Sequence, residues 1–259
     1  MSANGVAELT RTSLADCLPN REAALTHPLT RAVLTNVGSQ TEVYAPASTV
    51  GSPFIDALKR RWARERRRRK IGRAYDMALE IARVVPLGSK VLDVGCGNGF
   101  IAHHLSAMLA TRVIGIDVMD ATEAPIDYRG YNGVHFPLKH NSVDAVLLCY
   151  VLHHAQDVRA VLSEARRVLC AGGQVIVYED NPQSRWDKAV CWIHDRQWRD
   201  RTGPCTFRSE SEWLTLFESL GFEIIRERQL SRWRNLTHPV SRSFYVLRQS
   251  SIHRACLNV

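Results

Sequence analysis

A short apolar run that ends in three glycines at alternate positions is the feature that most constrains this chain. Residues 91–99 read Val-Leu-Asp-Val-Gly-Cys-Gly-Asn-Gly, and Ile101, Leu105 and Leu109 then recur on one face of a helix. The order is strand, glycine turn, helix. A ligand can approach the backbone closely only where side chains are absent, and the first N–H groups of a helix favour an anionic group. The sequence therefore predicts a ligand-binding turn.

The spacing of the glycines distinguishes this turn from the dinucleotide-binding pattern. A dinucleotide turn reads G-x-G-x-x-G, whereas the glycines of 95–99 alternate. A second apolar stretch, 112–116, ends in Asp117, 24 positions after Asp93. An acid at the end of a second strand can accept hydrogen bonds from both ribose hydroxyls. The alternative is an ordinary turn with Asp117 as a strand-end residue, but the position of the acid favours a nucleotide-like ligand.

Apolar runs and helical periods alternate from residue 90 onward. We expect strands at 90–94, 112–116, 143–149, 173–179, 222–229 and 243–248, a weak strand near 133–136, and helices at 99–109, 157–169, 185–200 and 210–220. Alternation of this kind predicts a parallel sheet with right-handed crossovers. A further helical region spans 54–84, and the pattern leaves open whether it is one helix or two. Ligands of such sheets bind beyond the carboxyl ends of the strands.

Composition indicates a soluble globular protein in a reducing compartment. The chain has 259 residues, of which 45% are apolar and 23% charged, and no apolar run approaches the roughly 20 residues of a membrane span. We expect no secretory signal, because the first residues contain no apolar core segment. The seven cysteines include no C-x-x-C pair. The sequence therefore predicts reduced thiols, a cytoplasmic location, no disulfide and no metal site.

The net charge of +8 is concentrated in one segment. Residues 59–70 read KRRWARERRRRK, which is typical of a solvated helix face or of a surface that meets anions. We favour the solvated face, because helical register scatters these charges around the axis. Residues 1–52 lack a sustained period and are rich in small and polar residues, so we expect a loosely ordered N-terminal segment there and one domain over 53–259.

Four blocks of sequence carry a resemblance to a known enzyme family. They are VLDVGCGNG (91–99), IGID (114–117), FPLKHNSVDAVLLCYVLHH (136–154) and EARRVLCAGGQVIVYED (164–180). Together they resemble the class I S-adenosylmethionine-dependent methyltransferases, in particular the ubiquinone/menaquinone-biosynthesis-type branch, from about Ile71 to Val246. The resemblance implies S-adenosyl-L-methionine as cofactor and an α/β, Rossmann-like fold. That fold has a seven-stranded, mostly parallel sheet with an antiparallel last strand, helices on both faces, and cap elements at 53–84 and 181–210.

The resemblance also assigns cofactor contacts. By analogy, Asp93 and the backbone of 95–99 hold the methionine part, and Asp117 holds the ribose. Asn132 stands where relatives usually carry an acid that accepts a hydrogen bond from the adenine amino group. The alternative is that Asn132 and the following glycine form only a turn. The expected cofactor-binding residues are Asp93, Gly95, Cys96, Gly97, Gly99, Asp117, Asn132 and Cys149.

Two histidines after the fourth strand are the candidate catalytic residues. An O–H or N⁺–H acceptor must lose a proton, and an imidazole suits that task near neutral pH. His153 and His154 are the nearest candidates; the alternative for both is a role in packing and helix capping. The helix at 185–200 adds His194, three tryptophans and several arginines. These could bind a flat or anionic acceptor, or could equally be packing plus a solvated face, which we slightly favour.

These observations predict a methyltransferase that acts on a small or lipid-like metabolite. One alternative is RNA or protein methylation, which the basic segment favours. The chain lacks both an appended RNA-binding motif and the Asn/Asp-Pro-Pro-aromatic signature that amine methyltransferases carry after the fourth strand. Another alternative is a cofactor-binding module without transferase activity. We expect a small-molecule methyl acceptor and no stable nucleic-acid complex, and leave membrane-surface contact and the oligomeric state open.

Overall fold

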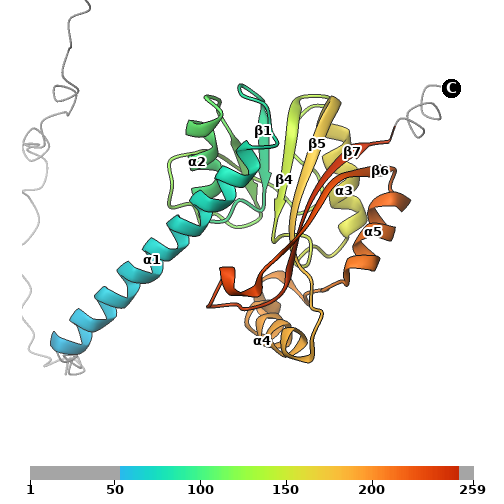
Figure 1. Cartoon of the computed structure of the whole chain (residues 1–259). Helices are drawn as coiled ribbons and strands as arrows, with labels where there is room; N and C mark the ends of the chain where they lie inside the picture. Colours follow the sequence, from blue (N-terminus) through green and yellow to red (C-terminus); the bar gives the residue numbers. More distant parts are fainter. Residues whose placement is uncertain (1–52, 251–259) are drawn as a thin grey trace, which may run out of the picture. The chain divides into compact units, whose positions relative to one another are not determined.

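The computed structural model describes residues 53–250, so the expectation for the N-terminal segment 1–52 lies outside the described residues (Figure 1). The helices are α1 (Pro53–Ala82), α2 (Phe100–Met108), α3 (Val158–Val168), α4 (Arg185–Thr202), α5 (Glu210–Ser219) and the short 3₁₀ helix η1 (Arg232–Arg234). The strands are β1 (Val91–Val94), β2 (Ile114–Asp117), β3 (Asp127–Gly130), β4 (Val143–Cys149), β5 (Leu169–Asp180), β6 (Phe222–Leu230) and β7 (Arg242–Gln249).

All seven strands form one sheet in the order β3-β2-β1-β4-β5-β7-β6. The pairs β1–β2, β2–β3, β1–β4 and β4–β5 are parallel, whereas β7 runs antiparallel to both β5 and β6. The strand order changes direction between β1 and β4, which is where open parallel sheets bind ligands. The predicted α/β class, with a mostly parallel seven-stranded sheet and an antiparallel last strand, is confirmed.

Helices α3 and α5 cover one face of the sheet. Leu162 of α3 and Trp213 and Phe217 of α5 are fully buried against strand residues such as Val146 and Val177. Burial of each large apolar side chain contributes about 1.5–3 kcal/mol to stability. Because alternate strand residues point to opposite faces, the neighbours of these strand residues belong to the other core.

The second half of α1, together with α2, covers the opposite face. Ala78 and Ile81 of α1 and Leu105 of α2 pack on Leu147 of β4 and Ile176 of β5. Figure 1 shows α1 and α2 on one side of the sheet, α3 and α5 on the other, and α4 beyond one end of the strands. The predicted covering of both faces is therefore confirmed, and α4 is placed over the edge where the strands end.

Helix α1 is continuous, which answers the question that the sequence pattern left open. Its inward face is narrow, because Ala74, Ala78 and Ile81 are buried while Tyr75 and Leu79 are exposed. The first half is solvent-exposed on all sides, and Trp62 is 73% exposed. None of the helices in residues 53–250 is long and apolar enough to cross a membrane.

The predicted position of the third strand is wrong. The third strand is Asp127–Gly130 and not the region near 133–136. This edge strand reads DYRG and is half exposed, so it carries no apolar run that a periodicity argument could detect. In the region predicted as a strand, the Asn132 side-chain oxygen accepts hydrogen bonds from the N–H groups of Val134 and His135 at 3.0 and 2.9 Å. That arrangement is a turn.

The inward face of α4 also differs from the prediction. The apolar spacing of 185–200 predicts Trp186, Val190, Ile193 and either Gln197 or Trp198 as inward residues. Yet Trp186 and Ile193 are 58% and 50% exposed. The buried positions are Asp187, Cys191 and Asp195. Asp187 forms a capping box with Ser184, and Asp195 accepts a hydrogen bond from the N–H of Cys205 at 2.7 Å. Apolar periodicity fails here because the helix buries carboxylates that satisfy backbone donors.

Candidate active site

A cavity of about 520 Å³ lies at the carboxyl ends of β1, β2, β4 and β5. The glycine turn after β1 forms one end, and α4 with the loop between η1 and β7 forms the other. Residues of α1 line the remaining wall. The lining residues that bear on function are Arg73, Gly95, Gly97, Asp117, Tyr131, Tyr150, His153, His154, Tyr178, Asp180, His194, Trp198, Arg234, His238 and Arg242.

Gly97 presents bare backbone to this cavity. Its φ is +50°, and a Cβ built on it would meet no heavy atom within 4 Å. The Asp117 carboxylate at the end of β2 accepts hydrogen bonds from the N–H of Gly97 at 2.8 Å and from the N–H of Met119 at 3.1 Å. The turn is therefore held open by a buried carboxylate, and any side chain at Gly97 would occupy ligand space.

The other two glycines of the turn are required by packing. A Cβ on Gly95 would lie 2.5 Å from Cγ2 of Val151, and one on Gly99 would lie 2.9 Å from Cδ1 of Ile126. Both residues also have positive φ values, +67° and +77°. These positions let the strand ends and the start of α2 approach closely, so their contribution to ligand binding is to the shape of the turn.

Asp93 is a buried carboxylate with an unsatisfied oxygen. It is 1% exposed, and its Oδ2 has no hydrogen-bond partner among the described residues. Burial, and then the negative charge of Asp117, raises the pKa of Asp93 to about 7. Burial of an ionised carboxylate costs free energy unless a cation or a hydrogen-bond donor contacts it. The ammonium group of an amino-acid moiety fits this position.

Five of the predicted cofactor residues do not line the cavity, namely Asp93, Cys96, Gly99, Asn132 and Cys149. Cys96 and Cys149 are buried free thiols, and burial raises the pKa of each. Asn132 is exposed with its oxygen engaged in the turn described above, while its neighbour Tyr131 lines the cavity. Among the predicted cofactor residues, Gly95, Gly97 and Asp117 are the ones that face it. Contact of Asn132 with adenine stays a prediction.

One ring nitrogen of His153 contacts a carboxylate, and the other has no hydrogen-bond partner among the described residues. Its Nδ1 lies 2.6 Å from Oε2 of Glu179, whose other oxygen accepts a hydrogen bond from the N–H of Leu152 at 2.7 Å. The Nε2 atom has no hydrogen-bond partner within the described part of the chain, although the residue is 2% exposed. Burial lowers the pKa of His153, but the charge and hydrogen bond of Glu179 outweigh it and the net pKa is raised.

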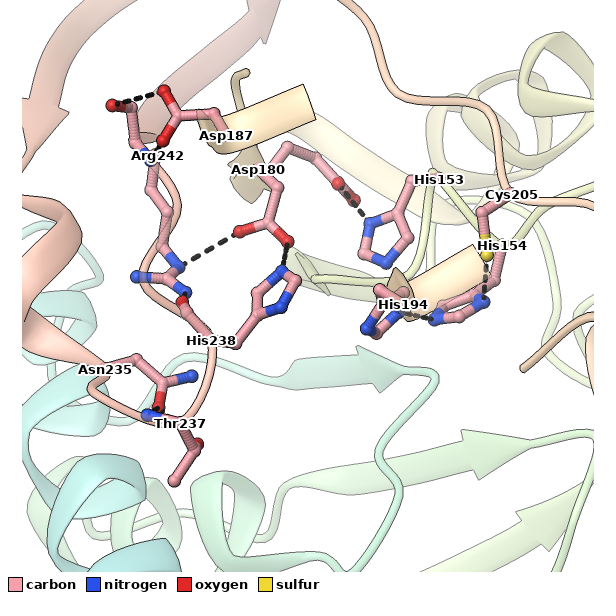
Figure 2. Close-up of polar contacts among 12 residues, drawn as sticks. His153, His154, Asp180, Asp187, His194, Cys205, Asn235, Thr237, His238 and Arg242 are labelled. Carbon is pink, nitrogen blue, oxygen red and sulfur yellow. Dashed lines mark hydrogen bonds and ion pairs between the residues drawn. The ribbon is translucent and has the colours of Figure 1, made fainter. Parts of the chain in front are cut away.

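His154 lies beside His153 and contacts α4. Its Nε2 is 3.3 Å from Nε2 of His194, and its Nδ1 is 3.3 Å from Sγ of Cys205 (Figure 2). The same Nδ1 is 3.0 Å from Oγ1 of Thr202. Burial, followed by the charges of the neighbouring histidines, lowers the pKa of His154 to about 3 and that of His194 to about 4. Both rings are therefore neutral at physiological pH.

A buried polar cluster closes the far side of the cavity, and sequence reasoning missed two of its members, His238 and Arg242. Asp180, at the end of β5, lies 2.7 Å from Nε2 of His238 and 3.0 Å from Nε of Arg242, as Figure 2 shows. Burial raises the pKa of Asp180, but the hydrogen bond of His238 and the charge of Arg242 lower the pKa by more than burial raises it. The net pKa of Asp180 is therefore below the usual range. The one available signal was the acid at a strand end, because His238 and Arg242 belong to no motif.

The predicted aromatic and arginine site on α4 is only partly assembled. Trp198 lines the cavity, whereas Trp186 and Trp192 are exposed and do not. Arg196 lies over the ring of Trp192, 4.8 Å from its centroid, and Arg199 pairs with Asp195. The arginines that do line the cavity, Arg73, Arg234 and Arg242, come from other elements.

Comparison with known proteins identifies this architecture. The family model described as "Methyltransferase domain" matches residues 92–177. A "Probable S-adenosylmethionine-dependent methyltransferase" of Mycolicibacterium smegmatis is 40% identical over 147 residues, which cover 53% of this chain and 53% of that protein. Residues 92–177 thus match a methyltransferase domain, and the chain is similar to S-adenosylmethionine-dependent methyltransferases.

Two further comparisons extend this similarity. The "Sterol 24-C-methyltransferase erg6" of Aspergillus fumigatus is 31% identical over 166 residues, covering 56% of this chain and 42% of that protein. The chain spans about half the length of the curated relatives it matches. The crystal structure of a SAM-dependent methyltransferase from Methanosarcina mazei superimposes with a TM-score of 0.52 at 18% identity, covering 66% of this chain and 96% of that one. The last likeness concerns the fold.

The matched methyltransferase domain implies S-adenosyl-L-methionine as cofactor, and the residues present fit that molecule. The unsatisfied oxygen of Asp93 suits the ammonium group of its methionine part. The open space at Gly97 is a place that a Cβ would fill. The carboxylate of Asp117 retains lone pairs for hydroxyl donors beyond its two backbone contacts.

Proposed function

We propose that this protein transfers the methyl group of S-adenosyl-L-methionine to a small or lipid-like acceptor bound in the cavity. The observation that carries the proposal is the continuity of one cavity of about 520 Å³ from Gly97 and Asp117 to His153 and Trp198. An acceptor at the histidine end would lie next to a cofactor at the glycine turn. Methyl transfer depends mainly on such proximity and alignment and on exclusion of water.

The cofactor end of the site would be formed by three acidic or glycine positions. Asp93 would pair with the ammonium group, the backbone at Gly97 would accommodate the methionine part, and Asp117 would accept hydrogen bonds from the ribose. When bound, S-adenosyl-L-methionine supplies a methyl group on a positively charged sulfonium sulfur. The two carboxylates at this end lie close enough for the charge of Asp117 to raise the pKa of Asp93, and a cationic ligand would relieve that repulsion.

The acceptor end combines aromatic rings with positive charge. Tyr150, Tyr178 and Trp198 line it together with Arg73 and Arg242. This chemistry suits a ring-bearing or extended apolar molecule that carries an anionic or hydroxyl group. The sterol methyltransferase among the relatives acts, by its name, on a lipid, which is consistent with a lipid-like acceptor here.

Of the two candidate catalytic histidines, His153 is better placed to meet an acceptor. Its Nε2 has no hydrogen-bond partner among the described residues, and the residue lines the cavity. Both nitrogens of His154 have neighbours, on Thr202 and His194. We therefore assign contact with the acceptor to His153 and a positioning role to His154.

The class of acceptor can be tested without knowing its identity. The protein is incubated with methyl-labelled S-adenosyl-L-methionine and a cell extract, which is then separated into small-molecule, lipid, RNA and protein fractions. We expect label in the small-molecule or lipid fraction, and none of that transfer with Gly97→Val, whose side chain would fill the cofactor path. Label confined to RNA or protein would overturn the proposed acceptor class.

One observation favours RNA as the second candidate. Residues 59–69 of α1 are exposed throughout and include Arg60, Arg61 and Arg64. Two of the charges are paired locally, Arg67 with Glu123 and Arg69 with Glu65. A surface of this kind attracts phosphates without sequence preference. Label in the RNA fraction would make this the leading function.

A further inference from the structure

Three histidines that are distant in sequence converge at one point of the cavity wall. His153 and His154 follow β4, whereas His194 lies on α4, and one ring nitrogen of each lies within 4.8 Å of those of the other two. All three residues line the cavity. We propose that His153, His154 and His194 bind a divalent transition-metal ion of the zinc type, with an open coordination position facing the cavity.

The spacing of the nitrogens suits a tetrahedral ion. The two Nε2 atoms of His154 and His194 are 3.3 Å apart. Ligands at the zinc–nitrogen distance of about 2.0–2.1 Å stand roughly 3.3–3.4 Å apart at the corners of a tetrahedron. His153 supplies the third nitrogen, and its ring centroid lies 4.3 Å from that of His154 and 5.4 Å from that of His194. Since the three nitrogens lie within 4.8 Å of one another, binding of the ion would draw His153 closer to the other two.

The outer contacts of these histidines are those of metal ligands. A histidine that binds a metal usually engages its other ring nitrogen with a carboxylate, a carbonyl or another fixed group, which orients the ring. Glu179 does this for His153 at 2.6 Å, and Thr202 does it for His154 at 3.0 Å. In both residues Nδ1 is thereby engaged, which leaves Nε2 for the ion.

The alternative is a simple hydrogen bond between His154 and His194. That bond would leave Nε2 of His153 buried without a partner among the described residues, which is unfavourable. A metal ion would satisfy all three nitrogens at once. Three protein nitrogens with an open fourth position is the pattern of catalytic zinc sites.

The open position would specify the acceptor, on the assumption that the proposed methyltransferase function is correct. Zinc takes oxygen ligands readily and lowers the pKa of a bound hydroxyl or water. The acceptor would thus be a hydroxyl compound that meets His153 through the ion. Its oxygen would take the methyl group as the carbon–sulfonium bond breaks and S-adenosylhomocysteine leaves, and its proton would leave to solvent. Binding of the ion itself does not depend on this assumption.

Metal binding is tested on the full-length protein without an affinity tag. The protein is stripped with a chelator and titrated with zinc by calorimetry and with cobalt(II) by visible absorption. We expect one equivalent per chain, with the absorption of tetrahedral cobalt. The matched control is His103→Ala, which removes an exposed histidine of α2 outside the cavity and should bind like the wild type.

Variants of the site separate ligands from supports. His194→Ala and His154→Ala should each abolish the cobalt spectrum, and Glu179→Gln should weaken zinc about 10–100-fold by disturbing the orientation of His153. Thermal melting confirms that each variant is folded. If zinc binds wild type and His194→Ala with equal affinity, or if neither metal binds the wild type, the proposal is wrong.

The same preparations are titrated with S-adenosylhomocysteine, so that failure of either proposal is recognised separately. Zinc binding without cofactor binding would support the metal site and contradict the proposed transferase function. Cofactor binding without zinc or cobalt binding would leave that function standing and contradict the metal site. We expect both ligands to bind the wild type, and His194→Ala to retain S-adenosylhomocysteine while losing zinc.

Discussion

The carboxylate of Asp117 accepts a hydrogen bond from the backbone N–H of Gly97 at 2.8 Å, so the end of β2 fixes the turn that follows β1. The same carboxylate accepts a second bond from the N–H of Met119 at 3.1 Å. Both oxygens of Asp117 therefore have partners before any ligand binds. The residue has two tasks, because it shapes the turn and faces the space in which a ribose would lie.

Loss of the Asp117 carboxylate should weaken the cofactor strongly. We expect Asp117→Ala to reduce S-adenosylhomocysteine affinity at least about tenfold, equivalent to roughly 1.4 kcal/mol. The affinity of Asp117→Asn should lie between those of the wild type and Asp117→Ala. Calorimetry gives the affinities. The matched control is Asp127→Ala on the neighbouring strand, which removes a carboxylate outside the cavity that pairs with Arg129 at 3.4 Å. An effect below twofold for Asp117→Ala would place the ribose elsewhere.

Gly95→Ala should destabilise the fold more than a glycine replacement in open space does. The new Cβ would lie 2.5 Å from Cγ2 of Val151, in addition to the strain of a φ of +67°. Gly172 has a φ of +82° with nothing within 4 Å, so Gly172→Ala measures backbone strain alone. We expect the first variant to lose about 1–3 kcal/mol more than the second. Urea unfolding measures the stability of both variants. Equal losses of stability would show that Val151 moves away from the new Cβ at no cost.

Cofactor affinity should rise with pH and level off above pH 7. The pKa of Asp93 is raised to about 7 by burial and by Asp117, whereas a bound ammonium group stabilises its carboxylate form. Binding below pH 7 must therefore expel a proton, and affinity should change about tenfold per pH unit there. Calorimetry at several pH values, in buffers of different ionisation enthalpy, detects the proton. Asp93→Asn should remove this pH dependence, and its persistence in that variant would assign it to another group.

The stability of the protein without cofactor should show the opposite trend. An aspartate whose pKa is higher in the folded state binds more protons folded than unfolded between the two pKa values. The contribution of Asp93 to stability is thus fully present below its unfolded pKa of about 3.9 and is lost as pH rises to about 7. The difference in the free energy of unfolding between wild type and Asp93→Asn should change with this sign. A wild-type advantage that grows with pH would contradict it.

Two capping boxes offer a matched pair for the role of α4. Ser184 caps α4 and Ser209 caps α5, each through the N–H group three residues on. Replacement of either by alanine should cost about 0.5–2 kcal/mol. Only Ser184→Ala should speed hydrogen exchange in the helix that carries His194 and lower zinc affinity. Equal exchange in α4 for both variants would mean that packing, and not the cap, holds this helix.

The basic segment of α1 should bind RNA only weakly. Its charges are exposed, and binding through phosphates alone falls steeply as salt displaces the released counterions. We expect non-specific association that disappears near physiological salt, measured by fluorescence anisotropy with unrelated RNA sequences. A sub-micromolar, sequence-selective complex at about 150 mM salt would instead favour RNA as the substrate.

Much of the fold was predictable because its strands are continuous apolar runs. β4 and the glycine turn between β1 and α2 follow directly from residues 91–99 and 143–149. β3 was missed because a half-exposed edge strand needs no apolar residues. The predicted inward face of α4 was wrong because Asp187 and Asp195 are buried and accept hydrogen bonds from backbone N–H groups.

The sequence predicts only those site residues that lie within one local motif. The turn at 95–99 and Asp117 lie in recognisable motifs, and the structure brings them to one cavity. The partners of His153 and His154 lie 26 and 40 positions or more away, on β5 and α4. No local pattern connects such residues, since the fold alone brings them together. The expectation of no metal site was drawn from local spacing and did not weigh this histidine cluster.

The most direct test of the account is a calorimetric titration of S-adenosylhomocysteine into the wild type, Gly97→Val and Gly172→Val. Both substitutions place a branched side chain at a positive φ, +50° and +82°, where nothing lies within 4 Å, but only Gly97 faces the cavity. We predict one binding site per chain in the wild type and in Gly172→Val, and no binding in folded Gly97→Val. Absence of binding in the wild type, or unchanged affinity in folded Gly97→Val, would contradict the assignment of this cavity.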